Sequence, residues 1–264
     1  MKTICEYTID EYKGRIKRLS IILLLISSFM LAGCLTAEES GVITVAAAAN
    51  FTEPMNEIVL LFHKKTGIQI NVISSSSGKL YAQIIAGAPY DIFLSADEKM
   101  PRELFRKGLS EEPFIYANGE VVLWSSNKEF CSDGDWRHTI NRQKIKKIAI
   151  ANINTAPYGI AAMFALKNAE KWDAIQGKLV FSQDVSQAFQ YAATQSVDAA
   201  FCAKSFALSD RGKSGCFLPV KEAPRVVQSA CIIKRKELND AVKQFAFFLI
   251  SPDAEIIKKK YGYK

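Results

Sequence analysis

The stretch IQINVISSSSGKLYAQIIAGAPYDIFLS, residues 68–95, predicts a strand, a helix and a second strand in that order. Residues 68–73 alternate apolar and polar side chains, which is typical of a half-buried strand. Leu80 and Ile84 then recur at helical spacing, and a glycine ends this short helix. The apolar run at 91–95 predicts the second strand. A strand, a helix and a strand in succession indicate a parallel sheet covered by helices.

The same order of elements continues on both sides of this stretch. Upstream, residues 42–46 predict a buried strand, and a helix follows over 50–65 until Gly67 ends it. Downstream, the pattern predicts further strands with helices between them, and a terminal helix that includes Phe245 and Phe248. The further strands are expected at 120–125, 146–152, 178–182, 198–202 and 224–234.

These elements group into two α/β lobes with no Gly/Ser-rich or Pro-rich linker between them. We expect each lobe to be a mostly parallel sheet flanked by helices, and two crossing strands to join the lobes. The predicted boundaries place residues 41–120 and 229–264 in lobe I and residues 121–228 in lobe II.

Residues 1–34 have the pattern of a lipoprotein signal peptide. A basic region precedes an apolar run from Leu19 to Ala32, which is shorter than the ~20 residues of a comfortable membrane span. The run ends in LAGC at Cys34, which resembles the bacterial lipobox, whose cysteine is acylated and becomes the new N-terminus. Residues 35–40 would then form a tether. The alternative is an ordinary cleaved signal with a chance cysteine. Either way, we expect an exported protein on the periplasmic or cell-envelope face.

The composition fits a soluble globular protein. The chain has 264 residues, of which 49% are hydrophobic and 23% charged, so it can bury a substantial core. Residues 1–34 contribute a net charge of +2 to the total of +7, and the lysines and arginines of the remainder are scattered. Because no basic stripe interleaves with aromatic residues, we do not expect a nucleic-acid partner.

Export makes the oxidation state of the cysteines relevant. The part after the signal contains Cys131, Cys202, Cys216 and Cys231. One or two disulfides are possible, with four buried or free thiols as the alternative, and the sequence leaves any pairing open. No Cys/His spacing suggests zinc, so no metal is expected as a free cation.

Recognisable catalytic chemistry is absent from the sequence. The two histidines, His63 and His138, lie in polar surroundings typical of surface residues. No nucleophile elbow, phosphate loop, dinucleotide fingerprint or zinc-protease motif occurs. Since an enzyme needs a nucleophile or an acid/base pair, the sequence favours a binding protein without a cofactor.

Four junctions between a predicted strand and a helix contain small or hydrogen-bonding residues: AAANFTEPM, with Asn50 at the turn, SSSSGKL, NTAPYGI and SQDVSQA. Helix starts present unpaired N–H groups and the positive end of the helix dipole, which together favour an anion. In open α/β sheets such junctions line the ligand crevice, so two from each lobe could enclose one small anion. Apart from Lys79 they contain no cation. For any single junction, an ordinary helix cap is the alternative.

The same blocks resemble a known family. VAAAANFTEPM, SSSSGKLYAQIIAGAPYDIFLSADE, IANINTAPYGIAA, SQDVSQAFQYAA and the terminal SPDAEIIKKKYGYK are similar to the molybdate-binding component of the molybdate ABC transporter. The resemblance extends from about Val42 to Lys264. It implies the two-lobe, type II periplasmic binding protein fold.

The resemblance also implies ligand contacts by position. It points to Asn50, Ser77, Tyr158 and Val185, with the last two acting through backbone N–H groups. Asn50 takes the place of a serine found in many relatives, and it could donate through its amide or its backbone. Further candidates are Ala49, Ser76, Gly78 and Ala203. Ala203 falls where some relatives have a tyrosine hydroxyl, so that contact is missing or replaced, with Ser205 nearby.

The implied function is high-affinity binding of molybdate and tungstate and their delivery to the permease and ATPase of an ABC transporter. Lipidation at Cys34 would add the membrane as a partner, and a monomer is expected. Two alternatives remain open: a receptor for sulfate, phosphate or a carboxylate on the same fold, and an exported enzyme or regulatory module. The two oxyanions have the same charge and nearly the same size, so the sequence does not separate them.

Overall fold

The structure is a computed structural model that describes residues 42–235 and 240–264. The predictions for the signal peptide, for Cys34 and for the tether at 35–40 lie outside these residues. Within the described residues, no helix has the length and apolar character needed to span a membrane.

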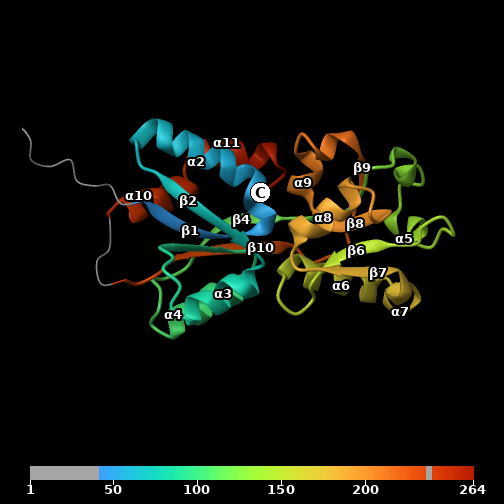
Figure 1. The fold of residues 1–264 in the computed structure, drawn as a ribbon, viewed down its shortest axis with the longest axis horizontal. Coiled ribbons are helices and arrows are strands. Elements are labelled where there is room, and N and C mark those ends of the chain that lie inside the picture. The colour runs from blue at the N-terminus through green and yellow to red at the C-terminus, as the bar shows by residue number, and fades with distance from the viewer. Residues whose placement is uncertain (1–41, 236–239) are drawn as a thin grey trace, which may run out of the picture. The chain divides into compact units, whose positions relative to one another are not determined.

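The first sheet has the strand order β2-β1-β3-β10-β4 (Figure 1). Strand β1 pairs in parallel with β2 and β3, and β10 pairs antiparallel with β3 and β4. The strands are β1 Ile43–Ala48, β2 Ile70–Ser75, β3 Ile92–Ser95, β4 Phe114–Gly119 and β10 Val226–Ile232.

Helices cover both faces of this first sheet, and together they form lobe I. Figure 1 shows α2 and α11 on one face and α3 and α4 on the other. On the first face, Phe62 and Phe245 pack edge to face with ring centroids 5.0 Å apart. On the second face, Leu80 and Leu104 are fully buried. The helices are η1 Ala49–Phe51, α2 Thr52–Thr66, α3 Ser77–Ile85, α4 Lys99–Arg106, α10 Asp240–Leu249 and α11 Pro252–Lys260.

The second sheet repeats this design in the order β7-β6-β8-β5-β9. Strand β6 is parallel to β7 and β8, and β5 is antiparallel to β8 and β9. In each sheet, therefore, the antiparallel strand lies next to one edge. The strands are β5 Val121–Ser125, β6 Ile148–Ala151, β7 Leu179–Ser182, β8 Ala199–Ala203 and β9 Cys216–Pro219.

The helices around the second sheet complete lobe II. Its core contains Trp124, whose ring lies 4.8 Å from that of Phe189, and Phe189 stacks on Phe206. The helices are η2 Lys128–Cys131, α5 Trp136–Thr139, α6 Pro157–Asn168, α7 Trp172–Ile175, η3 Gln176–Lys178, α8 Val185–Ala193, α9 Lys204–Leu208 and η4 Gly212–Ser214.

The chain passes between the lobes twice, each time from an edge strand into the antiparallel strand of the other sheet. Strand β4 leads through Glu120 into β5, and β9 leads through residues 220–225 into β10. On the return, β10 already pairs with β4 at Val226.

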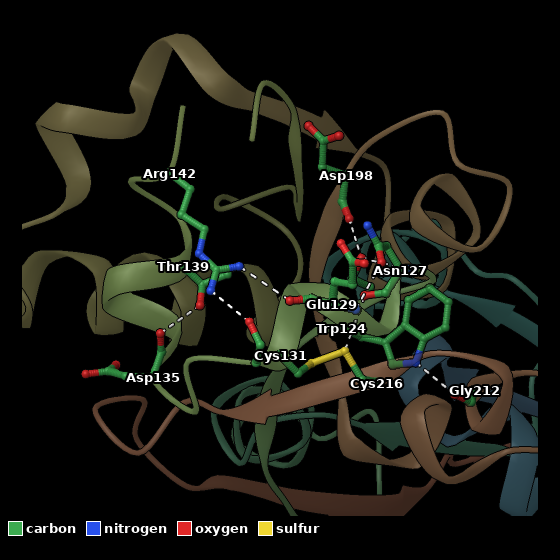
Figure 2. Close-up of a disulfide and its surroundings, with 12 residues drawn as sticks. Trp124, Asn127, Glu129, Cys131, Asp135, Thr139, Arg142, Asp198, Gly212 and Cys216 are labelled. Atoms are coloured by element: carbon green, nitrogen blue, oxygen red, sulfur yellow. Dashed lines mark hydrogen bonds between the residues drawn. A yellow bond between two sulfur atoms is a disulfide. The ribbon is translucent and has the colours of Figure 1, made fainter. Parts of the chain in front are cut away.

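A disulfide ties the outer part of lobe II. Cys131, at the end of η2, is bonded to Cys216 at the start of β9 (Figure 2). Cys202 and Cys231 are free and buried. Among the described cysteines, this resolves the pairing that the sequence left open.

The predicted α/β fold of two lobes is confirmed, and so are most of its elements. The helix that ends at Gly67 does so with the left-handed backbone conformation that glycine favours, φ +76°. Two strands escaped prediction, β4 and β9, and both lie at sheet edges. The predicted terminal helix corresponds to α10, and a further helix, α11, which Pro252 starts after the Ser251 cap, was not predicted.

Candidate functional site

All four residues proposed as ligand contacts line one small pocket. Asn50 and Ser77 come from lobe I, and Tyr158 and Val185 come from lobe II. The empty space between these residues, which opens to solvent, is about 190 Å³. Its other lining residues are Ala48, Ala49, Ser76, Ala96, Ala156, Pro157 and Asp184.

The four further candidates are divided by the structure. Ala49 and Ser76 line the pocket. Gly78 directs its backbone N–H elsewhere, to the carbonyl oxygen of Thr155 at 2.9 Å. Ala203 is buried at the end of β8 and is not among the lining residues.

Three helices begin at this pocket, and the local sequence explains why. Ser77 is the first residue of α3, and Val185 is the first residue of α8, which Asp184 caps by accepting from Gln187 N at 3.0 Å. Pro157 opens α6, where its missing N–H is not needed. The first N–H groups of a helix have no acceptor within that helix, and the helix dipole is positive there. The pocket is therefore suited to an anion.

Two serine hydroxyls add side-chain donors. The Ser77 oxygen accepts from Ala96 N at 2.9 Å, which fixes the hydroxyl and leaves its proton free to be donated. Ser76 is 3% exposed, and its Oγ has no hydrogen-bond partner among the described residues. A buried hydroxyl without a partner costs free energy, so a guest that accepts from it would relieve that cost.

The side-chain amide of Asn50 is hydrogen-bonded within the protein and is not available to a ligand. Its amide nitrogen donates to Gln228 Oε1 at 2.8 Å and to the Tyr263 hydroxyl at 3.0 Å. Both amide hydrogens are thus engaged away from a ligand. What Asn50 can offer an anion is its backbone N–H at the start of η1.

The pocket lacks a cation among its lining residues. Lys79 on α3 in lobe I donates to Gln183 Oε1 in lobe II at 2.6 Å. Asp97, the residue after Ala96, accepts from Met100 N at 2.9 Å, and burial raises the pKa of its carboxyl. Any anion held here would rest on neutral N–H and O–H donors.

Other parts of the described chain offer weaker candidates. A larger, open hollow in lobe II is bordered by the segment after β5 and by Arg142, which is paired with Asp133. No group of His, Cys, Asp and Glu among the described residues could hold a metal ion. His63 and His138 are exposed, as the sequence predicted.

Local sequence patterns did not single out several residues in and around the pocket. Ala96 joins the pocket through its backbone, at the end of a strand where no side-chain chemistry marks it. Ala156 and Pro157 stand inside the quoted NTAPYGI block, which did carry a signal. Gln228 and Tyr263 are distant in sequence from Asn50, which they contact, so local patterns could not find them.

The chain forms two α/β lobes and crosses between them twice. Helix starts from both lobes line one small pocket. These features define a two-lobe solute-binding protein. The chain belongs to the bacterial extracellular solute-binding protein family, whose sequence pattern matches residues 43–264.

Named relatives support the same placement. The molybdate-binding protein ModA of Rhodobacter capsulatus is 34% identical over 226 residues, which cover 85% of this chain and 88% of the relative. The solved periplasmic molybdate-binding protein of Azotobacter vinelandii matches with a TM-score of 0.78 at 33% identity, covering 84% of this chain and 98% of that chain. YvgL of Bacillus subtilis, whose name describes a substrate-binding lipoprotein of an ABC transporter, is 27% identical over 266 residues, covering 94% of this chain and 98% of the relative.

Proposed function

We propose that the protein binds molybdate outside the cytoplasmic membrane and delivers it to an ABC permease and its ATPase. The observation that carries the proposal is the single pocket where helix starts from both lobes meet, with Asn50, Ser77, Tyr158 and Val185 on its wall. Relatives named as molybdate-binding proteins, at about one-third identity over most of the chain, support this choice of anion.

Neutral donors suit a compact dianion with four oxygens. Each oxygen can accept from one or two N–H or O–H groups, and no long cationic side chain has to be ordered around it. A hydrogen bond to a charged acceptor contributes roughly 1.5–3 kcal/mol, so about six of them would outweigh the cost of association. In this proposal, Ser76 and Ser77 supply hydroxyl donors and the helix starts supply backbone donors.

Tungstate belongs in the same proposal. It has the same charge as molybdate and nearly the same size, and hydrogen-bond donors respond to charge and size rather than to the identity of the central atom. Sulfate is smaller, so the same donors would meet its oxygens less well. The pocket radius is then the feature that sets selectivity.

Delivery to a membrane complex fits a tethered receptor that has no catalytic role and needs no cofactor. In the proposal, Cys34 is acylated and residues 35–40 connect the lobes to the membrane surface as a monomer. The YvgL relative, which matches 94% of this chain, is named as a lipoprotein. Metabolic labelling with a fatty-acid analogue tests this part, because Cys34→Ala should abolish the label.

Calorimetric titration of the purified protein tests the ligand. Molybdate and tungstate should bind with submicromolar affinity, and sulfate should bind at least about a hundredfold more weakly. Ser77→Ala should weaken molybdate binding by roughly 1–3 kcal/mol, because one direct donor is lost. The absence of heat with both molybdate and tungstate would refute the proposal. Tight sulfate, phosphate or carboxylate binding would instead assign the fold to another small anion.

A further inference from the structure

Hydrogen bonds join side chains from both lobes into a ring beside the pocket. Asn50 Nδ2 donates to Gln228 Oε1 at 2.8 Å and to the Tyr263 hydroxyl at 3.0 Å. Gln228 Nε2 donates to the Tyr158 hydroxyl at 3.2 Å, and the Tyr158 and Tyr263 hydroxyls are hydrogen-bonded to each other. Tyr116 adds an O–H bond to Gln228 Oε1 at 2.9 Å. Both ends of the Gln228 amide are therefore engaged.

The side chains of the ring are buried, and its three tyrosine hydroxyls are protonated. Gln228 is 0% exposed, and the least buried member, Tyr263, is 4% exposed. Burial raises the pKa of Tyr116, Tyr158 and Tyr263, so their hydroxyls keep the protons that they donate. In such surroundings a broken hydrogen bond leaves a polar group without water, which makes the arrangement stiff.

The ring connects the two sides of the pocket. Asn50 lies on η1 in lobe I, Tyr158 lies on α6 in lobe II, and both line the pocket. Gln228 does not line it, yet its amide is hydrogen-bonded to both of these pocket residues, as is the Tyr263 hydroxyl. A change at Gln228 would therefore alter how the two helix starts face each other.

The backbone around Gln228 is shaped for this role. It lies on β10, just after the chain has returned from lobe II, and the pairing of β4 with β10 shifts register between Gln228 and Ser229. At the end of β4, Gly119 pairs with Val226 and leaves room for the amide of Gln228. A Cβ at Gly119 would overlap the Tyr158 hydroxyl and lie 2.7 Å from Gln228 Nε2.

We propose that Gln228 is a positioning residue of the anion site, whose buried amide sets the separation between Asn50 and Tyr158 and thereby the anion size that the closed pocket accepts. This inference rests on the proposed function. The amide acts through Asn50 and Tyr158 and does not touch the anion. Its oxygen holds Asn50 so that the backbone N–H faces the pocket, and its nitrogen holds the Tyr158 side chain and with it the start of α6.

The test compares Gln228→Met, which keeps the length of the side chain and removes both polar ends, with the matched control Gln183→Met. Gln183 also bridges the lobes, accepting from Lys79 at 2.6 Å, but it is exposed and outside the ring. Calorimetry with molybdate and with sulfate gives the ratio of the two affinities for each variant. We expect Gln228→Met to lower molybdate affinity by about tenfold or more and to lower the molybdate-to-sulfate ratio by about as much. The control should keep the wild-type ratio.

A double-mutant cycle with Tyr158→Phe adds a second readout. That change removes the hydroxyl that accepts from Gln228 Nε2, so the effects of Gln228→Met and Tyr158→Phe on molybdate affinity should be less than additive. If Gln228→Met fails to fold, Tyr158→Phe alone must still lower the molybdate-to-sulfate ratio.

Three results would overturn the inference. One is a wild-type ratio in Gln228→Met, another is an equal loss for both anions, which marks a general structural role, and the third is full additivity in the cycle. Each of them presupposes that the wild-type protein binds molybdate. A wild-type protein that binds no molybdate defeats the proposed function itself, which keeps the two failures distinguishable.

Discussion

Gly78 donates its backbone N–H to the carbonyl oxygen of Thr155 at 2.9 Å, which bonds the second residue of α3 directly to the loop before α6. This bond joins the two lobes at the edge of the pocket without using the ligand. Separation of the lobes would return both groups to water. This hydrogen bond therefore stabilises the closed arrangement of the lobes, in addition to the hydrogen bonds proposed for the anion.

Gly78→Ala should weaken ligand binding without weakening the fold. A Cβ at Gly78 would lie 2.8 Å from the Thr155 oxygen and 3.0 Å from its Cα, so the lobes could not approach as closely. Overpacking of this kind costs about 1–3 kcal/mol, which predicts roughly a tenfold loss of molybdate affinity. Without ligand, alanine is the better helix residue, so the melting temperature should not fall. Calorimetry and thermal unfolding check the two parts.

Gly177→Ala is the matched control, because a Cβ at Gly177 meets open space. It should leave molybdate affinity within about twofold of wild type. Unchanged affinity in Gly78→Ala would show that the close approach of α3 to Thr155 plays no part in binding.

Ser76→Ala should weaken molybdate binding without lowering the stability of the fold. The Ser76 hydroxyl is buried and has no partner among the described residues, so its removal should leave the free energy of unfolding unchanged or slightly raised. If it donates to the anion, molybdate binding should weaken by roughly 1–3 kcal/mol. Ser74→Ala, in the same serine run but exposed, should change neither quantity. A Ser76→Ala variant that is less stable but binds normally would argue for a role in the fold.

The junction between the lobes should respond to acid. Glu120 lies between β4 and β5, and hydrogen bonds from Lys264 at 2.6 Å and Lys204 at 2.9 Å lower its pKa below the usual 4.5. Because its pKa is lower in the folded protein, ionised Glu120 stabilises the fold fully above about pH 4.5. This stabilisation is lost as the pH falls through the lowered pKa.

Glu120→Gln should therefore cost about 1 kcal/mol or less near neutral pH, because the pair is partly exposed. The difference from wild type should shrink as the pH falls below 4.5. Urea titrations at several pH values measure it, with the exposed Glu112→Gln as a control. A difference that stays constant over the whole pH range would rule out the ion pairs as its cause.

The disulfide should matter for stability and not for binding. Cys131 and Cys216 are 85 residues apart in sequence, and closing a loop of this size stabilises a fold by about 2–4 kcal/mol, sometimes more. Replacing both cysteines with alanine should lower the free energy of unfolding by this amount. Neither residue lines the pocket, so molybdate affinity should stay within about twofold. A large loss of affinity would instead connect the outer part of lobe II to the site.

The two free thiols, Cys202 and Cys231, should react slowly with alkylating reagents. Burial raises the pKa of Cys231 to about 12 and raises the pKa of Cys202 as well, so both should resist alkylation while the protein is folded. Mass spectrometry of the peptides that contain them should show modification only after unfolding. Rapid labelling of native Cys202 would contradict its burial at 0% exposure.

Sequence periodicity was sufficient for most of the fold, because buried strands and amphipathic helices alternate cleanly from β1 onward. The predicted junctions also led to the pocket, since each lies where a buried strand passes into a helix. Strands β4 and β9 were missed for a physical reason. Both are edge strands, and the burial of β4 is irregular, so its side chains do not alternate as a half-buried strand would.

The ring beside the pocket could not be found from local patterns. Gln228 contacts Asn50 across a separation of 178 residues, and Tyr263 contacts Asn50 across 213. These contacts depend on strand order and on how β10 crosses back into lobe I, both of which are long-range properties. For the same reason, the sequence assigned Asn50 a possible side-chain donation that the structure directs to Gln228 and Tyr263 instead.

Uncharged donors from both lobes are proposed to hold one tetrahedral dianion, and anomalous diffraction from crystals grown with molybdate would locate it. We expect one strong molybdenum peak in the pocket, within hydrogen-bond reach of the Ser77 hydroxyl and of the backbone N–H groups of Asn50, Tyr158 and Val185. A peak beside a lysine or arginine outside that pocket, or no ordered peak at saturating molybdate, would contradict it.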